Sequence, residues 1–332
     1  MGVSRTSPEI ADALAVNTCN ERGQGTGMGS ERRRTIDCVA WWRSSRFRAF
    51  IREARLRSCY IFGRARTGHP LDTENATDRI AREARHQNRR MEHALAGELE
   101  LRDRFYFINR AANARYDGLL AGLKGKRVVV VGSSDCGVTP LAREGVYVEG
   151  TDISPLSIEK LQRSIEKEGL GEFASARVMN AEDLQYAPAS LDMITCSGVL
   201  HHIDTEKALR SWARSLKPDG AVVLFEPLAL HPFVALFRVV TPHMRTPDEH
   251  PLRTRDFRLM AKYFAVVQRS DYGLLTPLCA GIAMIPGLRR VAVRLLPWLE
   301  AADSGVLKRF PLMGNFCWLT VVRLARPVDR GP

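Results

Sequence analysis

Two adjacent histidines and a glutamate occupy positions where apolar strands would bring reactive side chains together. His201 and His202 follow the apolar run "LDMITCSG", and Glu226 ends the next run, "AVVLFE". Histidine titrates close to neutral pH, which suits a general base. Ligands of open α/β sheets bind at the carboxyl ends of strands, so all three residues are candidate catalytic residues. The alternative roles are packing against the next helix for His202, and helix capping or pairing with arginine for Glu226.

A glycine-containing loop after an earlier strand could hold a cofactor. The run "RVVVVG" is β-branched without alternation, which is typical of a strand buried on both faces. Gly132 and Gly137 occupy two of the three glycine positions of a dinucleotide-binding turn, with Ser134 in the middle position. Asp152 lies twenty residues after Gly132 and ends the second strand. There it could accept hydrogen bonds from ribose hydroxyls or cap the following helix.

The order of apolar and helical segments from Lys126 to Pro227 predicts the fold. Short apolar runs alternate with helical segments that start with Ser or Asp and end in Gly. Strands that alternate with helices indicate a parallel sheet with helices on both faces. Five strands are expected in this part, and "FAVVQRSDY" and "CWLTVVRLARP" add a sixth and a seventh. The expected fold class is α/β and Rossmann-like, with a seven-stranded, mostly parallel sheet.

Three segments in this order resemble the class I S-adenosylmethionine-dependent methyltransferases, particularly the branch that acts on small molecules. They are "VYVEGTDISPLSIEKLQ", "ARVMNAEDLQYAPASLDMITCSGVLHHI" and "ALRSWARSLKPDGAVVLFEP". The resemblance covers roughly Lys126 to Pro227, with a weaker extension to Phe264. It implies the class I methyltransferase fold, S-adenosyl-L-methionine as cofactor, and methyl transfer to a small-molecule acceptor.

The resemblance also assigns residues to the cofactor. Gly132, Ser134 and Gly137 would form the turn against its methionine part. Where the family has an acid two residues before the first glycine, this chain has Val130, and Asp135 could substitute for it. The family usually shows G-x-G-x-G, so a serine and a cysteine replace its second and third glycines. The remaining expected contacts are Asp152 at the ribose, Ile153 on the adenine, Asn180, Ala181 and Glu182 at the adenine edge, and Ser197 and Gly198 beside the sulfonium.

Methyl transfer to oxygen asks little of the protein beyond alignment of the acceptor and removal of its proton. His201, His202 and Glu226 are the candidates for this work. The apolar insertion 273–315 could cover the crevice and favour a quinone, a polyketide or a lipid-linked acceptor; it could equally be core or a dimer face. The alternatives to an O-methyltransferase are an NAD(P)-dependent oxidoreductase and a non-catalytic binding protein on the same fold.

The charge of the chain is concentrated near its beginning. The formal net charge is +12 over 332 residues, and eleven arginines against Asp37 and Glu53 between Arg32 and Arg66 supply +9 of it. This segment could be a dispensable extension, or a basic aromatic arm for nucleic acid or an acidic membrane surface. The rest of the chain is only mildly basic, so nucleic acid is not an expected partner. Peripheral membrane contact and the oligomeric state are left open.

The expected organisation has four parts: an Arg-rich extension (1–74), a helical lead-in (75–125), a cofactor-binding core (126–228) and a lid or substrate region with the last two strands (229–325). Seven scattered cysteines without Cys-x-x-Cys spacing, and an N-terminus without an apolar signal segment, indicate a cytoplasmic protein.

Two further segments could carry a function. The apolar run from Tyr272 to Leu288 is too short to span a bilayer and contains two prolines, which indicates a buried or interfacial segment. The segment "TPHMRTPDEHPL" gathers His243, Asp248, Glu249 and His250. Its prolines break the helical spacing of metal ligands, so a polar turn or lid is expected there and no metal. Arg245 and Arg253, in and just after this segment, could meet an acidic substrate.

Overall fold

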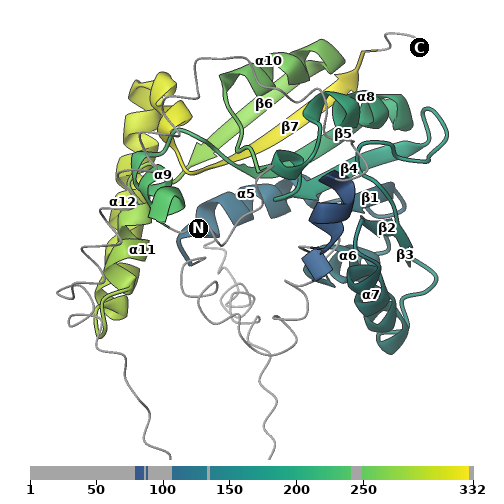
Figure 1. The fold of residues 1–332 in the computed structure, drawn as a ribbon, viewed down its shortest axis with the longest axis horizontal. Helices are drawn as coiled ribbons and strands as arrows, with labels where there is room; N and C mark the ends of the chain where they lie inside the picture. The colour runs from purple at the N-terminus through teal and green to yellow at the C-terminus, as the bar shows by residue number, and fades with distance from the viewer. Residues whose placement is uncertain (1–78, 86, 89–106, 133–134, 241–248, 329–332) are drawn as a thin grey trace, which may run out of the picture. The chain divides into compact units, whose positions relative to one another are not determined.

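A computed structural model describes residues 79–85, 87–88, 107–132, 135–240 and 249–328 (Figure 1). Its centre is a seven-stranded sheet with the order β3-β2-β1-β4-β5-β7-β6. Only β7 runs antiparallel to its neighbours, β5 and β6. The expected α/β fold with a mostly parallel sheet is confirmed. The strands are β1 (Arg127–Val131), β2 (Tyr147–Asp152), β3 (Ala174–Val178), β4 (Leu191–Ser197), β5 (Leu216–Pro227), β6 (Phe264–Tyr272) and β7 (Leu319–Pro327).

Helices cover both faces of the sheet because the central strands are apolar on both sides. Val128 and Val130 of β1 pack in a core cluster with α6 (Asp135–Arg143) and α7 (Pro155–Lys167). Val129 and Val131, which point to the opposite face, pack in a cluster with α8 (Thr205–Ser215) and α10 (Thr254–Tyr263). The continuous valine run of the sequence is therefore explained by burial on two faces.

One strand boundary differs from the sequence prediction. The pattern "EKALRSWARSLKPDG" predicts a helix ended by Pro-Asp-Gly, and "AVVLFEP" predicts the strand after it. In the structure α8 ends at Ser215 and β5 already starts at Leu216. The helix ends just before the Pro-Asp-Gly signal, and the strand begins earlier than the pattern predicts. Leu216 already pairs with Leu191 of β4, before an irregularity in the register of the two strands. Because these two buried leucines pair, Pro-Asp-Gly lies inside β5 and not in a turn between the helix and the strand.

The segments before and after the core are helical. Residues 79–85 and 87–88 are helical, as is α5 (Arg110–Leu120) after the short η2 (Phe107–Asn109). The C-terminal part contains α9 (Pro232–Val240), α11 (Pro277–Ala283), α12 (Arg289–Arg309) and η5 (Pro311–Phe316). Figure 1 shows α9, α11 and α12 beside one another. The Arg-rich extension lies outside the described residues. Within the described part, no helix is long and apolar enough to cross a membrane.

Candidate cofactor and catalytic site

The carboxyl ends of β1, β2 and β4 meet at one edge of the sheet. Val131 pairs with Thr151 on one side and with Cys196 on the other. The next residue, Gly132, has φ +74°, and a Cβ atom there would lie 2.1 Å from Cγ2 of Val199. Both the backbone angle and this close approach exclude a larger side chain. Gly132 therefore makes the tight turn that the sequence predicted after the first strand.

The helix after this turn begins earlier than the segment "TPLAREG", which the sequence pattern predicts to be helical. α6 starts at Asp135, and Gly137 lies in its first turn. The backbone N–H groups of a first helical turn have no partner inside the helix, so they are available to a ligand at this edge. Ser134 lies outside the described residues, and the side chain of Asp135 is not described.

Asp152 ends β2 at the same edge and is half-buried. Its Oδ1 accepts a hydrogen bond from the backbone N–H of Ser154 at 2.8 Å. The cap of α7 is Ser154, whose hydroxyl accepts from the N–H of Ser157 at 3.1 Å. The capping role considered for Asp152 therefore belongs to Ser154. The following Ile153 is also half-buried.

The loop after β3 is held by hydrogen bonds of its own. Oδ1 of Asn180 accepts from the N–H of Glu182 at 3.0 Å, and the carbonyl of Ala181 accepts from Nε1 of Trp212 at 2.8 Å. The buried Glu182 carboxylate accepts from the N–H of Asp204 at 2.9 Å and forms an ion pair with Arg79. These contacts hold the loop against α8 and against the helical residues 79–85.

The carboxyl end of β4 is exposed to solvent. Ser197 and Gly198 are exposed, and a Cβ atom at Gly198 would meet nothing within 4 Å. The edge thus combines a close approach at Gly132, a carboxylate at Asp152 and free space at Gly198. For an adenosyl cofactor over the strand ends, Asp152 offers a carboxylate that can accept from a ribose hydroxyl, and Gly198 offers no side chain that would block it.

His201 and Glu226 form a buried pair beside this opening. Nδ1 of His201 lies 2.6 Å from Oε2 of Glu226, which is fully buried. The other oxygen of Glu226 accepts from the N–H groups of Val199 at 3.0 Å and Leu200 at 2.9 Å. Burial, and then the Glu226 carboxylate, raise the pKa of the nearby Cys196 thiol well above its usual value. Cys196 is therefore a neutral thiol and no nucleophile.

His202 turns toward the helical segment 79–88. Its Nδ1 lies 3.5 Å from Oε1 of Glu83, and its carbonyl accepts from Arg79 at 3.2 Å. The rings of His201 and His202 lie 4.1 Å apart at a tilt of 40°. Arg79 and Glu83 had no role in the sequence analysis. The only signal for them was a helical pattern, which does not tell which part of the sheet a helix covers.

A second carboxylate faces the other nitrogen of His201. Oε1 of Glu249 lies 3.9 Å from Nε2 of His201 and 2.7 Å from Arg238. The N–H of His250 donates to the carbonyl of His201 at 2.7 Å. His243, Arg245 and Asp248 lie outside the described residues. Among the residues that are described, no group of three or more His, Cys, Asp or Glu is placed to hold a metal ion.

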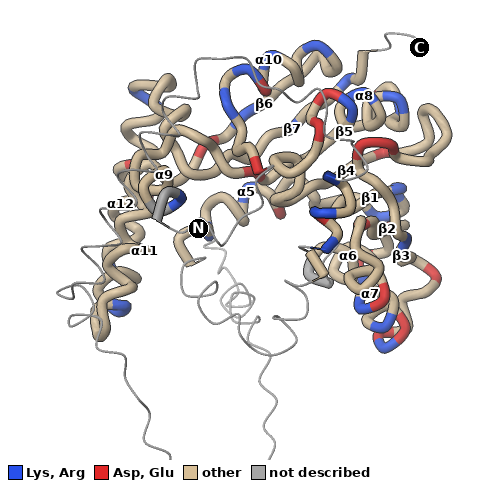
Figure 2. Tube along the Cα trace, in the orientation of Figure 1, with Lys and Arg blue, Asp and Glu red and all other residues tan. Residues whose placement is uncertain are grey.

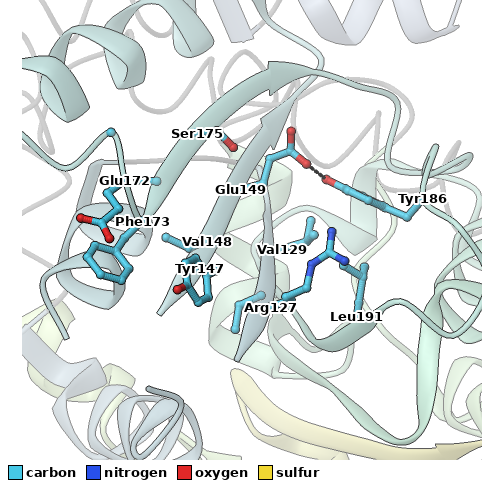
Figure 3. A pocket seen from close by; sticks show the side chains of 13 residues that line it. Arg127, Val129, Tyr147, Val148, Glu149, Glu172, Phe173, Ser175, Tyr186 and Leu191 are labelled. Carbon is cyan, nitrogen blue, oxygen red and sulfur yellow. Dashed lines mark hydrogen bonds between the residues drawn. The ribbon is translucent and has the colours of Figure 1, made fainter. Parts of the chain in front are cut away.

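The described residues also line a cavity of about 230 Å³ away from this edge (Figure 3). It lies against the beginnings of β1, β2 and β3, near Arg127, Tyr147 and Phe173. Tyr186 donates a hydrogen bond to Glu149 there. Ligands of open α/β sheets bind at the opposite ends of the strands, so we do not assign the cofactor to this cavity.

A family model described as a methyltransferase domain matches residues 130–224, which span β1 to β5. This part of the chain is a methyltransferase domain. The resemblance seen in the sequence is therefore confirmed for the domain and its fold. The NAD(P)-dependent oxidoreductase and the non-catalytic binding protein are not favoured.

The methyltransferase domain also aligns with curated proteins. The ubiquinone biosynthesis O-methyltransferase of Paracidovorax citrulli is 33% identical over 111 residues, which cover 32% of this chain and 45% of that protein. The protein of the same name from Hahella chejuensis is 35% identical over 128 residues, or 36% and 50% of the two chains. The chain thus spans about half the length of these relatives.

Among solved structures, the chain is similar to geranyl diphosphate C-methyltransferase of Streptomyces coelicolor A3(2), which was solved with S-adenosyl-L-homocysteine. The identity is 15%, the TM-score is 0.46, and the match covers 65% of this chain and 77% of that one.

Proposed function

We propose that this chain transfers a methyl group from S-adenosyl-L-methionine to an oxygen of a small, apolar acceptor. The proposal is supported by the methyltransferase domain at residues 130–224 and by relatives named as O-methyltransferases. The observation that carries it is the buried contact between Glu226 and His201, at the carboxyl ends of β4 and β5. A histidine held by a carboxylate is the kind of base that an oxygen acceptor needs.

The cofactor would be held at the strand ends. It supplies an electrophilic methyl group on a cationic sulfonium. Gly132 and Gly137 would face its methionine part, Asp152 would accept hydrogen bonds from the ribose, and Ile153 would pack on the adenine. The other residues proposed to contact it are Ser134, Asp135, Asn180, Ala181, Glu182, Ser197 and Gly198.

His201 would remove the proton of the acceptor. The Glu226 carboxylate can only accept at Nδ1, so the neutral imidazole carries its proton on Nδ1 and a lone pair on Nε2. A proton taken up on Nε2 would give an imidazolium with a Glu226 oxygen 2.6 Å from Nδ1 and a Glu249 oxygen 3.9 Å from Nε2. His202 shares the stack of rings and is the second candidate for the base.

The proposal keeps the four-part organisation, with 229–325 as the lid or substrate region, and a cytoplasmic location. The location is proposed from the sequence, in which seven scattered cysteines lack Cys-x-x-Cys spacing.

The test is transfer of labelled methyl from S-adenosyl-L-methionine to hydroxylated quinols and phenols with and without an apolar tail. The proposal expects label in the organic extract as a methyl ether, and loss of that label in His201→Gln. If S-adenosyl-L-homocysteine binds but no acceptor in a cell extract becomes labelled, the chain is a non-catalytic binding protein. If NADH binds instead, the chain is an oxidoreductase.

A further inference from the structure

The segment Pro277–Phe316, here named the C-terminal helical segment, carries most of the large apolar side chains that are exposed among the described residues. Eleven of the seventeen large apolar side chains that are exposed in the described part lie in it. Trp298 is 76% exposed and Leu312 is 81% exposed. So many exposed apolar side chains in one segment indicate a surface that contacts another protein, a ligand or a membrane.

The helix α12 has one buried face and one exposed face, which follow from the helical spacing of its residues. Ala292, Leu296 and Asp303 are buried and lie on one face, where Ala292 and Leu296 pack with α11. Val291 and Trp298, seven residues apart, lie together on the outer face. Figure 2 shows α11 without charged residues, whereas blue and red alternate along α7.

The exposed charges of the C-terminal helical segment are all positive. They are Arg289, Arg290, Arg294, Lys308 and Arg309. The two acidic residues of this segment already have partners within the fold. Glu300 pairs with Arg110 of α5, and Asp303 is buried and accepts from the N–H groups of Leu274 and Leu275.

We propose that the C-terminal helical segment docks on an anionic lipid bilayer, with Trp298 and its apolar neighbours at the interface and the arginines at the headgroups. Tryptophan and long cationic side chains are typical of this boundary, and each cation near an anionic leaflet adds to binding. A second copy of the chain would bring five cations against five cations. The segment between Arg32 and Arg66 has the same positive sign, so it does not complement this surface either. The inference stands independently of the proposed reaction.

The experiment compares sedimentation of the full chain with vesicles of phosphatidylcholine containing 30% phosphatidylglycerol and with phosphatidylcholine alone. The proposal expects binding to the anionic vesicles and at least about tenfold weaker partitioning for Arg289→Glu/Arg290→Glu/Arg294→Glu. The matched control is Arg255→Glu/Arg258→Glu/Lys262→Glu on α10, which makes the same change in net charge on exposed positions. Every variant retains residues 32–66, so their contribution to binding cancels.

A second measurement distinguishes insertion of Trp298 at the bilayer interface from electrostatic attraction of the arginines alone. Lipids brominated near the headgroup should quench part of the tryptophan fluorescence of the wild type, and Trp298→Phe should lose that part while it still sediments. Equal partitioning of the two triple variants, or unchanged quenching in Trp298→Phe, overturns the proposal. So does a wild-type dimer that Trp298→Glu dissociates without any vesicle binding, because the surface would then be an interface between two copies.

Discussion

Nδ1 of His201 lies 2.6 Å from Oε2 of Glu226, and Glu226 has no exposed surface. The second oxygen of the carboxylate is held by two backbone N–H groups at the end of β4. A charge that is buried with hydrogen bonds to both oxygens is fixed in position. The carboxylate therefore determines which nitrogen of His201 carries the proton.

Glu226→Gln tests this relationship. The amide oxygen can still accept from Val199 and Leu200, but the amide N–H₂ would face Nδ1 and place the imidazole proton on Nε2. We expect kcat of methyl transfer to fall by about 10²–10⁴, the usual contribution of a general base. The dissociation constant of S-adenosyl-L-homocysteine, measured by titration calorimetry, should remain unchanged. An unaltered kcat would show that the pair only positions the end of β4.

Gly132→Ala should destabilise the fold more than Gly198→Ala, although both glycines have positive φ. Alanine at Gly198 meets open space and costs about 1–2 kcal/mol of backbone strain. Alanine at Gly132 adds a clash with Val199, so the free energy of unfolding should fall by about 2–5 kcal/mol. Urea denaturation measures both.

A double variant gives the control for this comparison. Val199→Ala removes the Cγ2 atom, so it should recover part of the stability lost in Gly132→Ala. Equal losses for Gly132→Ala and Gly198→Ala would contradict the close approach seen at the first turn.

Arg79→Met should leave the buried Glu182 carboxylate without its cationic partner. The N–H of Asp204 still donates to Glu182, so we expect a loss of about 2–4 kcal/mol in the free energy of unfolding. Glu182→Gln in the same chain should restore a large part of it, because the amide carries no charge. If the double variant is no more stable than Arg79→Met, the ion pair is not what holds the segment 79–88 to the core.

The stability of the protein should depend on the protonation of His231 at the start of α9. Burial lowers the pKa of His231 below its ordinary value of 6.5. In the fold, Nδ1 accepts from the N–H of Val234 at 3.2 Å and Nε2 lies 3.1 Å from the carbonyl of Leu274, which requires the neutral form. The unfolded chain binds the proton more readily, so this stability is complete above pH 6.5 and decreases as the pH falls below it.

His231→Gln keeps a donor for Leu274 and does not titrate. We therefore expect Tm of the wild type to fall more between pH 7.5 and pH 5.5 than Tm of His231→Gln, as followed by circular dichroism. Parallel curves for the two proteins would contradict the assigned protonation state.

The sequence predicted the core well because its signals are local. The run of valines buried on both faces predicted β1, and Ser154 predicted the start of α7. Gly132 could be placed from the turn that follows a strand. The clash with Val199 could not, since it depends on how β1 and β4 pair.

Contacts between segments that lie far apart in the chain could not be predicted from the sequence pattern. Glu226 was expected at the crevice, but its partner His201 and the two N–H groups that bind it follow from the register of β4 and β5. Arg79, Glu83 and Glu249 reach the histidines from segments more than 40 residues away. Charge and helical periodicity do not specify such pairs.

We propose above that the carboxyl ends of β1, β2 and β4 bind S-adenosyl-L-methionine. Titration calorimetry with S-adenosyl-L-homocysteine tests it most directly, with Asp152→Asn as the variant because the amide oxygen can still accept from Ser154. We expect one site per chain, affinity at least about tenfold weaker in Asp152→Asn, which corresponds to about 1.4 kcal/mol, and no heat with NADH. Absence of binding, or equal affinity in the two proteins, would contradict the account.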